Sequence, residues 1–223
     1  MEVIKVASLR HSLFVIAAGL VVLVGSGLLV QDPPAAWEGS VFHFFNELPH
    51  NVEPVLWVLQ QMGSAMVLPF AAVVLWWVTR RWQPPVVLLS AGFLMGWLGA
   101  KVIKAMVGRG RPGAILDDVI LGFDVPITEV GFPSGHAVLA FTLVSASAPY
   151  LGRRGRITAI VIAIAVAVTR VYVGAHLPLD VIGGAGYGII IGTIVTLLSG
   201  PHTARTGLVA SATVEGDEGF EEG

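Results

Sequence analysis

Residues 169–180 hold three side chains that could do chemistry within one short stretch between two apolar runs. They are the cation Arg170, the imidazole His176 and the carboxylate Asp180. An arginine at the edge of an apolar segment costs about 2.5 to 3.5 kcal/mol on insertion scales, so its presence indicates a function. Asp180 lies one helical turn after His176, and Pro178 suits the first turn of a helix. The carboxylate can therefore orient the imidazole through one nitrogen and leave the other free as a nucleophile or base.

The same stretch also has a purely structural interpretation. Arg170 could anchor a helix at the membrane interface through its long side chain. Asp180 could be an ordinary carboxylate at a helix start, where it complements the helix dipole. The functional interpretation requires other reactive segments at the same end of the molecule, and the structural one does not. The rest of the chain therefore decides between them.

The composition is that of an integral membrane protein. The 223 residues are 55% hydrophobic and 13% charged, with a mean hydropathy of +0.80, whereas a soluble domain has about 25% charged residues. The chain has no cysteine, which excludes disulfides and thiolate metal sites. The net charge of −2 is uninformative as a total, and no nucleic-acid partner is expected. The positions of the cations are more informative, because cytoplasmic loops collect Lys and Arg.

Six apolar runs are long enough to predict membrane spans, since a span needs about 20 apolar residues. We expect them over residues 12–30, 54–79, 84–107, 133–151, 157–174 and 181–199. The first run begins like a signal peptide, but it is longer and lacks a cleavage site, so we expect it to be retained. The predicted fold is an all-α, polytopic membrane helical bundle with six transmembrane helices.

The segments around the spans have distinct compositions. Residues 35–53 mix aromatic and polar side chains and are expected to lie at the membrane interface, and residues 108–132 form a long polar loop. Residues 1–200 are predicted to be the membrane-embedded domain, and residues 201–223 an acidic, Gly-rich, disordered tail. Close helix packing is predicted for the glycines of the sixth run, which are Gly183, Gly184, Gly186, Gly188 and Gly192.

Both termini are predicted to be cytoplasmic. Six spans in this orientation place one set of cations on the cytoplasmic side: Lys5, Arg10, Arg80, Arg81, Arg153, Arg154, Arg156 and Arg205. The others fall on the opposite side, next to the polar loop or to residues 169–180: Lys101, Lys104, Arg109, Arg111 and Arg170. An anionic ligand explains this second set better than the topology does.

Three segments fall at this outer face by the parity of the spans. They are Lys104-x6-Arg111-Pro112, Pro133-Ser134-Gly135-His136 and Arg170-x5-His176-x3-Asp180. Lys104, Arg111 and Arg170 would neutralise phosphate oxygens, the arginines through bidentate forks. Ser134 and Gly135 stand where a helix begins, so backbone N–H groups and a hydroxyl can bind an anion there. The segments together predict a phosphoryl-transfer site.

Covalent catalysis by imidazole is the economical chemistry for this set, because the chain has no thiol and no acidic cluster for a metal. His176 would attack phosphorus in line, Asp180 would orient it, and His136 would protonate the leaving oxygen. Taken singly, Lys104 could be an interfacial lysine and Ser134 a plain helix cap. The prediction therefore depends on the convergence of all three segments.

The three segments resemble the three-part signature of the type 2 phosphatidic acid phosphatase superfamily, which also includes bacterial acid phosphatases and vanadium haloperoxidases. The resemblance covers about residues 100–182, and the six-span layout resembles the membrane lipid-phosphatase branch. Thr169 stands where the family usually has Ser, and it keeps the hydroxyl. The resemblance implies a phosphohistidine on His176, with His136 as general acid and Asp180 as the partner of His176. It also implies that no metal or other cofactor is needed and that the phosphate is bound by Lys104, Arg111, Ser134, Gly135 and Arg170.

We therefore expect a metal-independent lipid phosphate phosphatase in a bacterial cell membrane, with its site on the outer face. Its partners would be membrane lipids and a lipid substrate, either phosphatidate, phosphatidylglycerol phosphate or polyprenyl diphosphate. The sequence does not choose among these, and it does not define the oligomeric state. A haloperoxidase-like oxidation is disfavoured because that branch is soluble. The alternative from another class is a non-catalytic transporter or scaffold that binds an anionic lipid, which would need the cations but not two histidines and a carboxylate.

Overall fold

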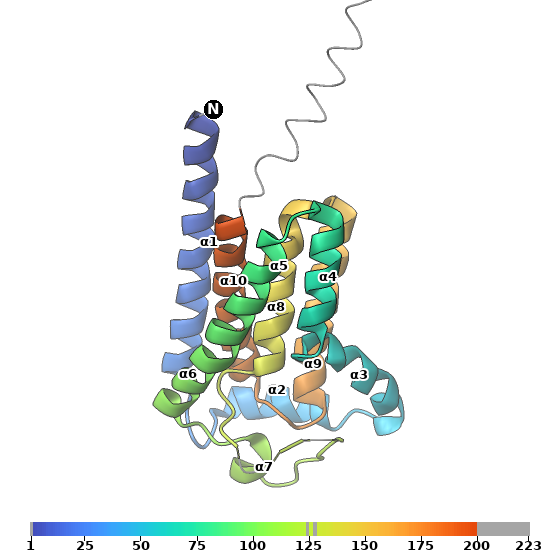
Figure 1. Cartoon of the computed structure of the whole chain (residues 1–223). Coiled ribbons are helices and arrows are strands. Elements are labelled where there is room, and N and C mark those ends of the chain that lie inside the picture. Colours follow the sequence, from blue (N-terminus) through green and yellow to red (C-terminus); the bar gives the residue numbers. More distant parts are fainter. Residues whose placement is uncertain (1, 124, 127–128, 200–223) are drawn as a thin grey trace, which may run out of the picture.

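The computed structural model describes residues 2–123, 125–126 and 129–199, and this part of the chain is almost entirely helical. Its one extended contact is an isolated bridge between Gly110 and Val130. Figure 1 shows the long helices running side by side, with α2 (Ala36–Asn46) and α7 (Pro112–Ile115) gathered at one end. The all-α prediction is confirmed for the described residues.

Within the described residues, four stretches are long and apolar enough to cross a membrane: Leu9–Leu29, Gln83–Val107, Arg153–Tyr172 and Pro178–Ser199. They coincide with the first, third, fifth and sixth predicted spans. Three of them are continuous helices, namely α1 (Glu2–Leu29), α9 (Arg153–Tyr172) and α10 (Pro178–Ser199). The other consists of α5 (Gln83–Ala91), a π-helical segment (Gly92–Gly99) and α6 (Ala100–Val107).

The second predicted span is broken rather than continuous. The segment His50–Gly63, which contains α3 (Glu53–Gln60), is bent by 59° from α4 (Val67–Thr79). Gly63, at the break, packs closely against the helix that contains His136. A Cβ on Gly63 would lie 2.6 Å from the backbone oxygen of His136. The break therefore lets this segment approach the end of the bundle where His136 lies.

The fourth predicted span is represented by α8 (Gly135–Ser147) and a following 3-10 turn (Ala148–Tyr150). Together they are shorter than the roughly 20 residues that a span needs. By length and composition, the described residues thus contain four spans, or five if the bent pair is counted as one. The count of six and the orientation of the termini remain predictions, and Arg205 and the tail of residues 201–223 lie outside the described residues.

Glycines bring α8 and α10 into backbone contact, as the sequence predicted. A Cβ at Gly184, Gly188 or Gly192 would lie 2.7, 2.3 or 2.4 Å from a backbone oxygen of α8 or its N-cap residue. Small residues of this kind are the usual means of helix association in lipid, where apolar side chains gain nothing by leaving the bilayer. The contact fixes the two helix starts relative to each other.

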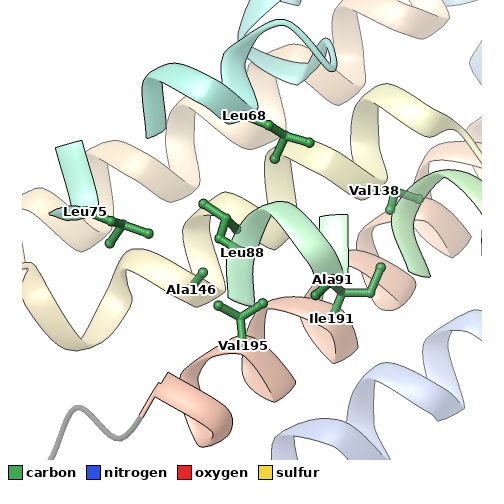
Figure 2. Packing of buried hydrophobic residues seen from close by; sticks show 8 residues of the cluster. All are labelled: Leu68, Leu75, Leu88, Ala91, Val138, Ala146, Ile191 and Val195. Atoms are coloured by element: carbon green, nitrogen blue, oxygen red, sulfur yellow. The ribbon is translucent and has the colours of Figure 1, made fainter. Parts of the chain in front are cut away.

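Apolar side chains fill the space between α4, α5, α8 and α10. The buried members of this cluster, shown in Figure 2, are Leu68, Leu75, Leu88, Ala91, Val138, Ala146, Ile191 and Val195. Close packing of this kind holds α4 and α5 against the α8–α10 pair. The helix ends that carry the reactive residues are thereby set on a rigid frame.

The predicted interfacial segment contains α2, which lies across the end of the bundle against α9 and α10 (Figure 1). Phe42 of α2 is fully buried in a cluster with Val171 and Leu177. The Asn46 side chain donates hydrogen bonds to the backbone oxygens of Ile120 and Tyr172, each at 2.8 Å. It thereby ties α2 to both the polar loop and α9, so α2 covers the stretch at residues 169–180.

Candidate active site

The turn after α9 folds the chain back over Arg170. Gly174 takes the left-handed conformation with φ +72°, and a Cβ there would also lie 2.6 Å from the backbone oxygen of Ile120. The backbone N–H groups of Ala175 and His176 both donate to the carbonyl oxygen of Arg170, each at 3.1 Å. This turn places the imidazole of His176 at the end of α9 that carries Arg170.

Asp180 stands in the first turn of α10, next to His176. Its Oδ2 accepts a hydrogen bond of 2.9 Å from the backbone N–H of Leu177, which is the contact of a capping carboxylate. The same Oδ2 lies 3.4 Å from Nδ1 of His176, a close contact in which Nδ1 has no aligned hydrogen bond. The helix-start interpretation of Asp180 and its pairing with His176 therefore both fit the geometry, and Nε2 is the imidazole nitrogen that Asp180 does not face.

Ser134 is the N-cap residue of α8, but its side chain makes no capping hydrogen bond. Its Oγ is buried without a partner, and its backbone N–H donates to the carbonyl oxygen of Asp180 at 2.9 Å. At Gly135, the space where a Cβ would stand has no atom within 4 Å. The start of α8 thus offers a free hydroxyl and open space beside the motif that contains Asp180.

The two arginines predicted to bind phosphate leave part of their hydrogen-bonding capacity unused. Arg111 donates through Nη1 to the carbonyl oxygen of Ala175 at 3.0 Å, and Arg170 donates through Nη1 to Oε1 of Gln60. The Nε atoms of both arginines are buried and have no partner. Buried polar groups without partners are uncommon in proteins. The two Nε–H donors therefore need acceptor oxygens that the surrounding residues do not supply.

Lys104 lies in the last turn of α6 and is half-buried. Its Nζ donates to the backbone oxygens of Val130 and Gly131, at 2.6 and 3.1 Å. These two carbonyls directly precede the segment that contains Ser134. Lys104 therefore anchors the end of the polar loop to α6, in addition to placing a positive charge near the helix starts.

The electrostatics of the site keep His176 neutral. Burial lowers the pKa of His176 well below its ordinary value of 6.5, and the positive charges of Arg111, Arg170 and Lys104 lower it further. A neutral imidazole has a lone pair available, which is the state that a nucleophile or base requires. The influence of these cations also shows that the three predicted segments lie within electrostatic range of one another.

All the residues predicted for the site occur at the end of the bundle where α2 and α7 lie (Figure 1). The structure brings together His176, His136, Asp180, Lys104, Arg111, Ser134, Gly135 and Arg170. Among the described residues, no group of three or more His, Cys, Asp and Glu side chains is placed to hold a metal ion. The arrangement suits a multiply charged oxyanion, because its unused groups are donors and cations.

Arg109 corrects one expectation from the sequence. It was assigned with the outer cations to an anionic ligand, but its side chain is buried between two carboxylates of the protein. Its Nη1 lies 3.0 Å from Oε1 of Glu38 and 3.0 Å from Oδ1 of Asp180, and its Nη2 lies 2.5 Å from Oε2 of Glu38. The charge of Arg109 is therefore compensated within the protein.

Three further partners of the site were not predicted. Glu38 binds Arg109, Gln60 binds Arg170, and the largely exposed Glu129 lies 3.1 Å from Nη2 of Arg111. Glu38 carried one signal in the sequence, because it is a carboxylate within an aromatic-rich segment. Gln60 and Glu129 had no local pattern that would have separated them from ordinary polar residues.

The fold is that of an integral membrane protein whose helix ends gather cations, buried donors and two histidines. Residues 80–203, more than half of the chain, match the family model of the PAP2 superfamily. The chain therefore belongs to the PAP2 superfamily, and the resemblance found in the sequence is confirmed.

Three known proteins illustrate the relationship. A lipid A 1-phosphatase from Rhizobium johnstonii is 35% identical over 52% of this chain, and the match spans 47% of the relative, so the two share about half of that protein's length. An undecaprenyl-diphosphatase from Sulfolobus acidocaldarius is 30% identical over 63% of this chain and 66% of the relative. The crystal structure of Aquifex aeolicus LpxE superposes with a TM-score of 0.64 at 26% identity, covering 72% of this chain and 95% of that one.

The neutral state of His176 can be measured directly. In a pH titration of ring NMR signals from the ligand-free protein in detergent micelles, His176 should protonate with a midpoint below 6.5, because burial and nearby cations oppose its positive charge. Its signal is assigned by its loss in the His176→Ala variant. A midpoint at or above 6.5 would contradict the electrostatics described above.

Proposed function

We propose that this PAP2 superfamily member is a phosphatase that hydrolyses a phosphomonoester or diphosphate on a membrane lipid. One observation carries the proposal: the buried donors Ser134 Oγ, Arg111 Nε and Arg170 Nε have no partner, and both arginines act electrostatically on the neutral imidazole of His176. A phosphoryl group has several acceptor oxygens and a negative charge, so it would satisfy all three donors at once. The names of the relatives support the same class of substrate, since they denote lipid phosphate and lipid diphosphate hydrolases.

The first chemical step follows from the roles available to the two histidines. Nε2 of His176 attacks the phosphorus atom while the bond from phosphorus to the lipid oxygen breaks, and His136 gives its proton to that oxygen. The product is a phosphohistidine and a free lipid alcohol or lipid monophosphate. Asp180 faces Nδ1 and stabilises the positive charge that develops on the imidazole of His176.

The second step returns the enzyme to its starting state. Now unprotonated, His136 takes a proton from water as the water oxygen attacks the phosphorus of the phosphohistidine. The bond between phosphorus and Nε2 breaks, and inorganic phosphate leaves. In both steps Lys104, Arg111 and Arg170 balance the charge on the equatorial oxygens, while Ser134 Oγ and the backbone N–H of Gly135 donate hydrogen bonds to them.

An apolar pocket supports a lipid rather than a soluble substrate. The pocket has a volume of about 240 Å³ and lies between α2, α9 and α10, where Phe45, Val171, Pro178 and Val181 contribute to its wall. Pro178 and Val181 flank Asp180 in the chain, so an acyl or prenyl chain in this pocket would end close to the reactive residues. Similar apolar surfaces would accept phosphatidate, phosphatidylglycerol phosphate and polyprenyl diphosphate alike.

The proposal extends to topology and location. With six spans and both termini in the cytoplasm, the site faces outward from a bacterial cell membrane, which agrees with the clustering of cations on the other side. The chain lacks cysteine, so single cysteines can be introduced without background. Ala114 is exposed in α7 at the site end, and Gly152 is exposed where α9 begins, at the opposite end.

In intact cells, Ala114→Cys should react with a membrane-impermeant thiol reagent and Gly152→Cys should not. Both should react after the cells are permeabilised, which controls for buried thiols. The reverse pattern would place the site in the cytoplasm and contradict the proposed orientation.

The two histidines should be separable by the leaving group that they serve. An aryl phosphate such as nitrophenyl phosphate leaves with little protonation, whereas a lipid alkoxide needs an acid. His136→Ala should therefore lose phosphatidate hydrolysis at least tenfold more than nitrophenyl phosphate hydrolysis, and His176→Ala should lose both alike. Phosphate release in detergent with EDTA present is the measurement, and EDTA should not change the wild-type rate.

Two outcomes would contradict this assignment. Equal loss of both substrates in a folded His136→Ala variant would mean that His136 is not the acid. Binding of phosphatidate by a wild-type protein that releases no phosphate from any lipid phosphate would favour a transporter or scaffold instead of an enzyme.

A further inference from the structure

Three fully buried ionisable side chains join α2 to the first turn of α10, which carries Asp180. Arg109 lies between Glu38 and Asp180, and all three side chains are 0% exposed. Glu38 binds the guanidinium through both carboxylate oxygens, at 3.0 and 2.5 Å, whereas Asp180 binds it through Oδ1 alone at 3.0 Å. Oε1 of Glu38 also accepts a hydrogen bond of 2.9 Å from the backbone N–H of Leu179 in the first turn of α10.

Stability alone does not account for such a network. Removing charges from water is costly, and a buried ion pair is often no more stable than apolar side chains of the same size. Burial would by itself lower the pKa of Arg109, but the hydrogen bonds and charges of Glu38 and Asp180 raise it above its ordinary value. Arg109 therefore stays protonated between the two carboxyl groups that contact it.

The geometry points to Glu38 and Arg109 as positioning residues, which hold the Asp180 carboxylate in the orientation that His176 needs. Oδ1 of Asp180 is fixed by Arg109, and Oδ2 is fixed by the backbone N–H of Leu177, at 3.4 Å from Nδ1 of His176. With both oxygens fixed, the carboxylate cannot rotate away from the imidazole. This inference rests on the proposed role of His176 as the nucleophile.

Glu38 has a specific part in this arrangement. If Glu38 were absent, Arg109 could turn both terminal nitrogens toward Asp180, which would neutralise that carboxylate and draw it from His176. By occupying two of the guanidinium contacts, Glu38 leaves Asp180 with a single one. A negative charge beside Nδ1 stabilises the imidazole as it becomes positive during attack on phosphorus.

Glu38 falls outside the part of the chain that matches the superfamily model. The family model matches residues 80–203, and Glu38 lies upstream, in the helix that covers the site. Glu38 lies outside all three motifs, and Arg109 stands at an unspecified position within the first one, between Lys104 and Arg111. A role for them in positioning Asp180 therefore comes from the contacts in this structure.

A double-mutant cycle tests the inference. kcat and KM for nitrophenyl phosphate are measured for wild type, Glu38→Gln, Asp180→Asn and the double variant, together with the melting temperature of each in detergent. Glu38→Gln should lower kcat about ten- to a hundredfold, the scale on which loss of an outer-shell partner acts in metal sites. KM should change less than about twofold, since Glu38 contacts Arg109 and Leu179 and not the predicted phosphate ligands. In the Asp180→Asn background, Glu38→Gln should cause no further loss of kcat.

Two controls separate positioning from folding. Glu47→Gln removes a carboxylate that is 66% exposed at the end of the same helix, and it should leave kcat and the melting temperature unchanged. Arg109→Lys keeps the charge but lacks the planar fork that binds both oxygens of Glu38 and Asp180 together, so it should reproduce the loss of kcat at constant KM. This second variant keeps the test valid if Glu38→Gln fails to fold.

The inference is overturned if Glu38→Gln leaves kcat unchanged, raises only KM, or lowers kcat by the same factor with and without Asp180. A purely structural role would lower the melting temperature without any dependence of kcat on the Asp180 background. Failure of the proposed function looks different, because His176→Ala, assayed in parallel, would then keep the wild-type rate.

Discussion

The close contact of α8 with α10 is the constraint on which the site depends. Where Gly184, Gly188 and Gly192 face α8, any side chain would collide with backbone oxygens. Because the two backbones touch, the start of α8 meets the start of α10, and the backbone N–H of Ser134 reaches the carbonyl oxygen of Asp180. A wider spacing would separate the donors at the start of α8 from the imidazole of His176. The two could then not act on one phosphorus atom together.

Charge balance at these helix ends explains the rest of the site. The bundle buries several cations at the edge of an apolar medium, where each needs a compensating charge or hydrogen bonds. Arg109 receives two buried carboxylates, whereas Arg111 donates to a backbone carbonyl and to the largely exposed Glu129, and Arg170 donates to the neutral side chain of Gln60. The charge of Arg109 is thus compensated by buried carboxylates, while the hydrogen-bond partners of Arg111 and Arg170 within the described residues include no buried carboxylate. Lipid-borne phosphate is the ligand that the family and the geometry both favour.

The sequence predicted the all-α class, four of the six proposed spans and the close packing of α10 from local spacing, and the convergence of three motifs from the parity of the spans. A glycine every fourth residue faces one neighbour, and reactive residues at helix starts on one side of a membrane must lie near one another. Pairings between distant segments were not predictable. Glu38 and Arg109 are 71 positions apart, and Gln60 and Arg170 are 110 apart, so no periodicity connects them. The break at Gly63 was also missed, because an apolar composition predicts that a segment enters the membrane and not that it stays straight.

The central claim is that His176 forms a covalent bond to phosphorus, and trapping of the phosphoenzyme tests it most directly. The enzyme is mixed with a radiolabelled lipid phosphate, quenched in alkaline detergent within the first turnover, and digested to locate the label. The account predicts a label on the peptide containing His176 that survives alkali and is lost in acid, as expected of a phosphoramidate, and that is absent from His176→Ala. Full single-turnover phosphate release without any labelled enzyme, or a label that persists in His176→Ala, would contradict it.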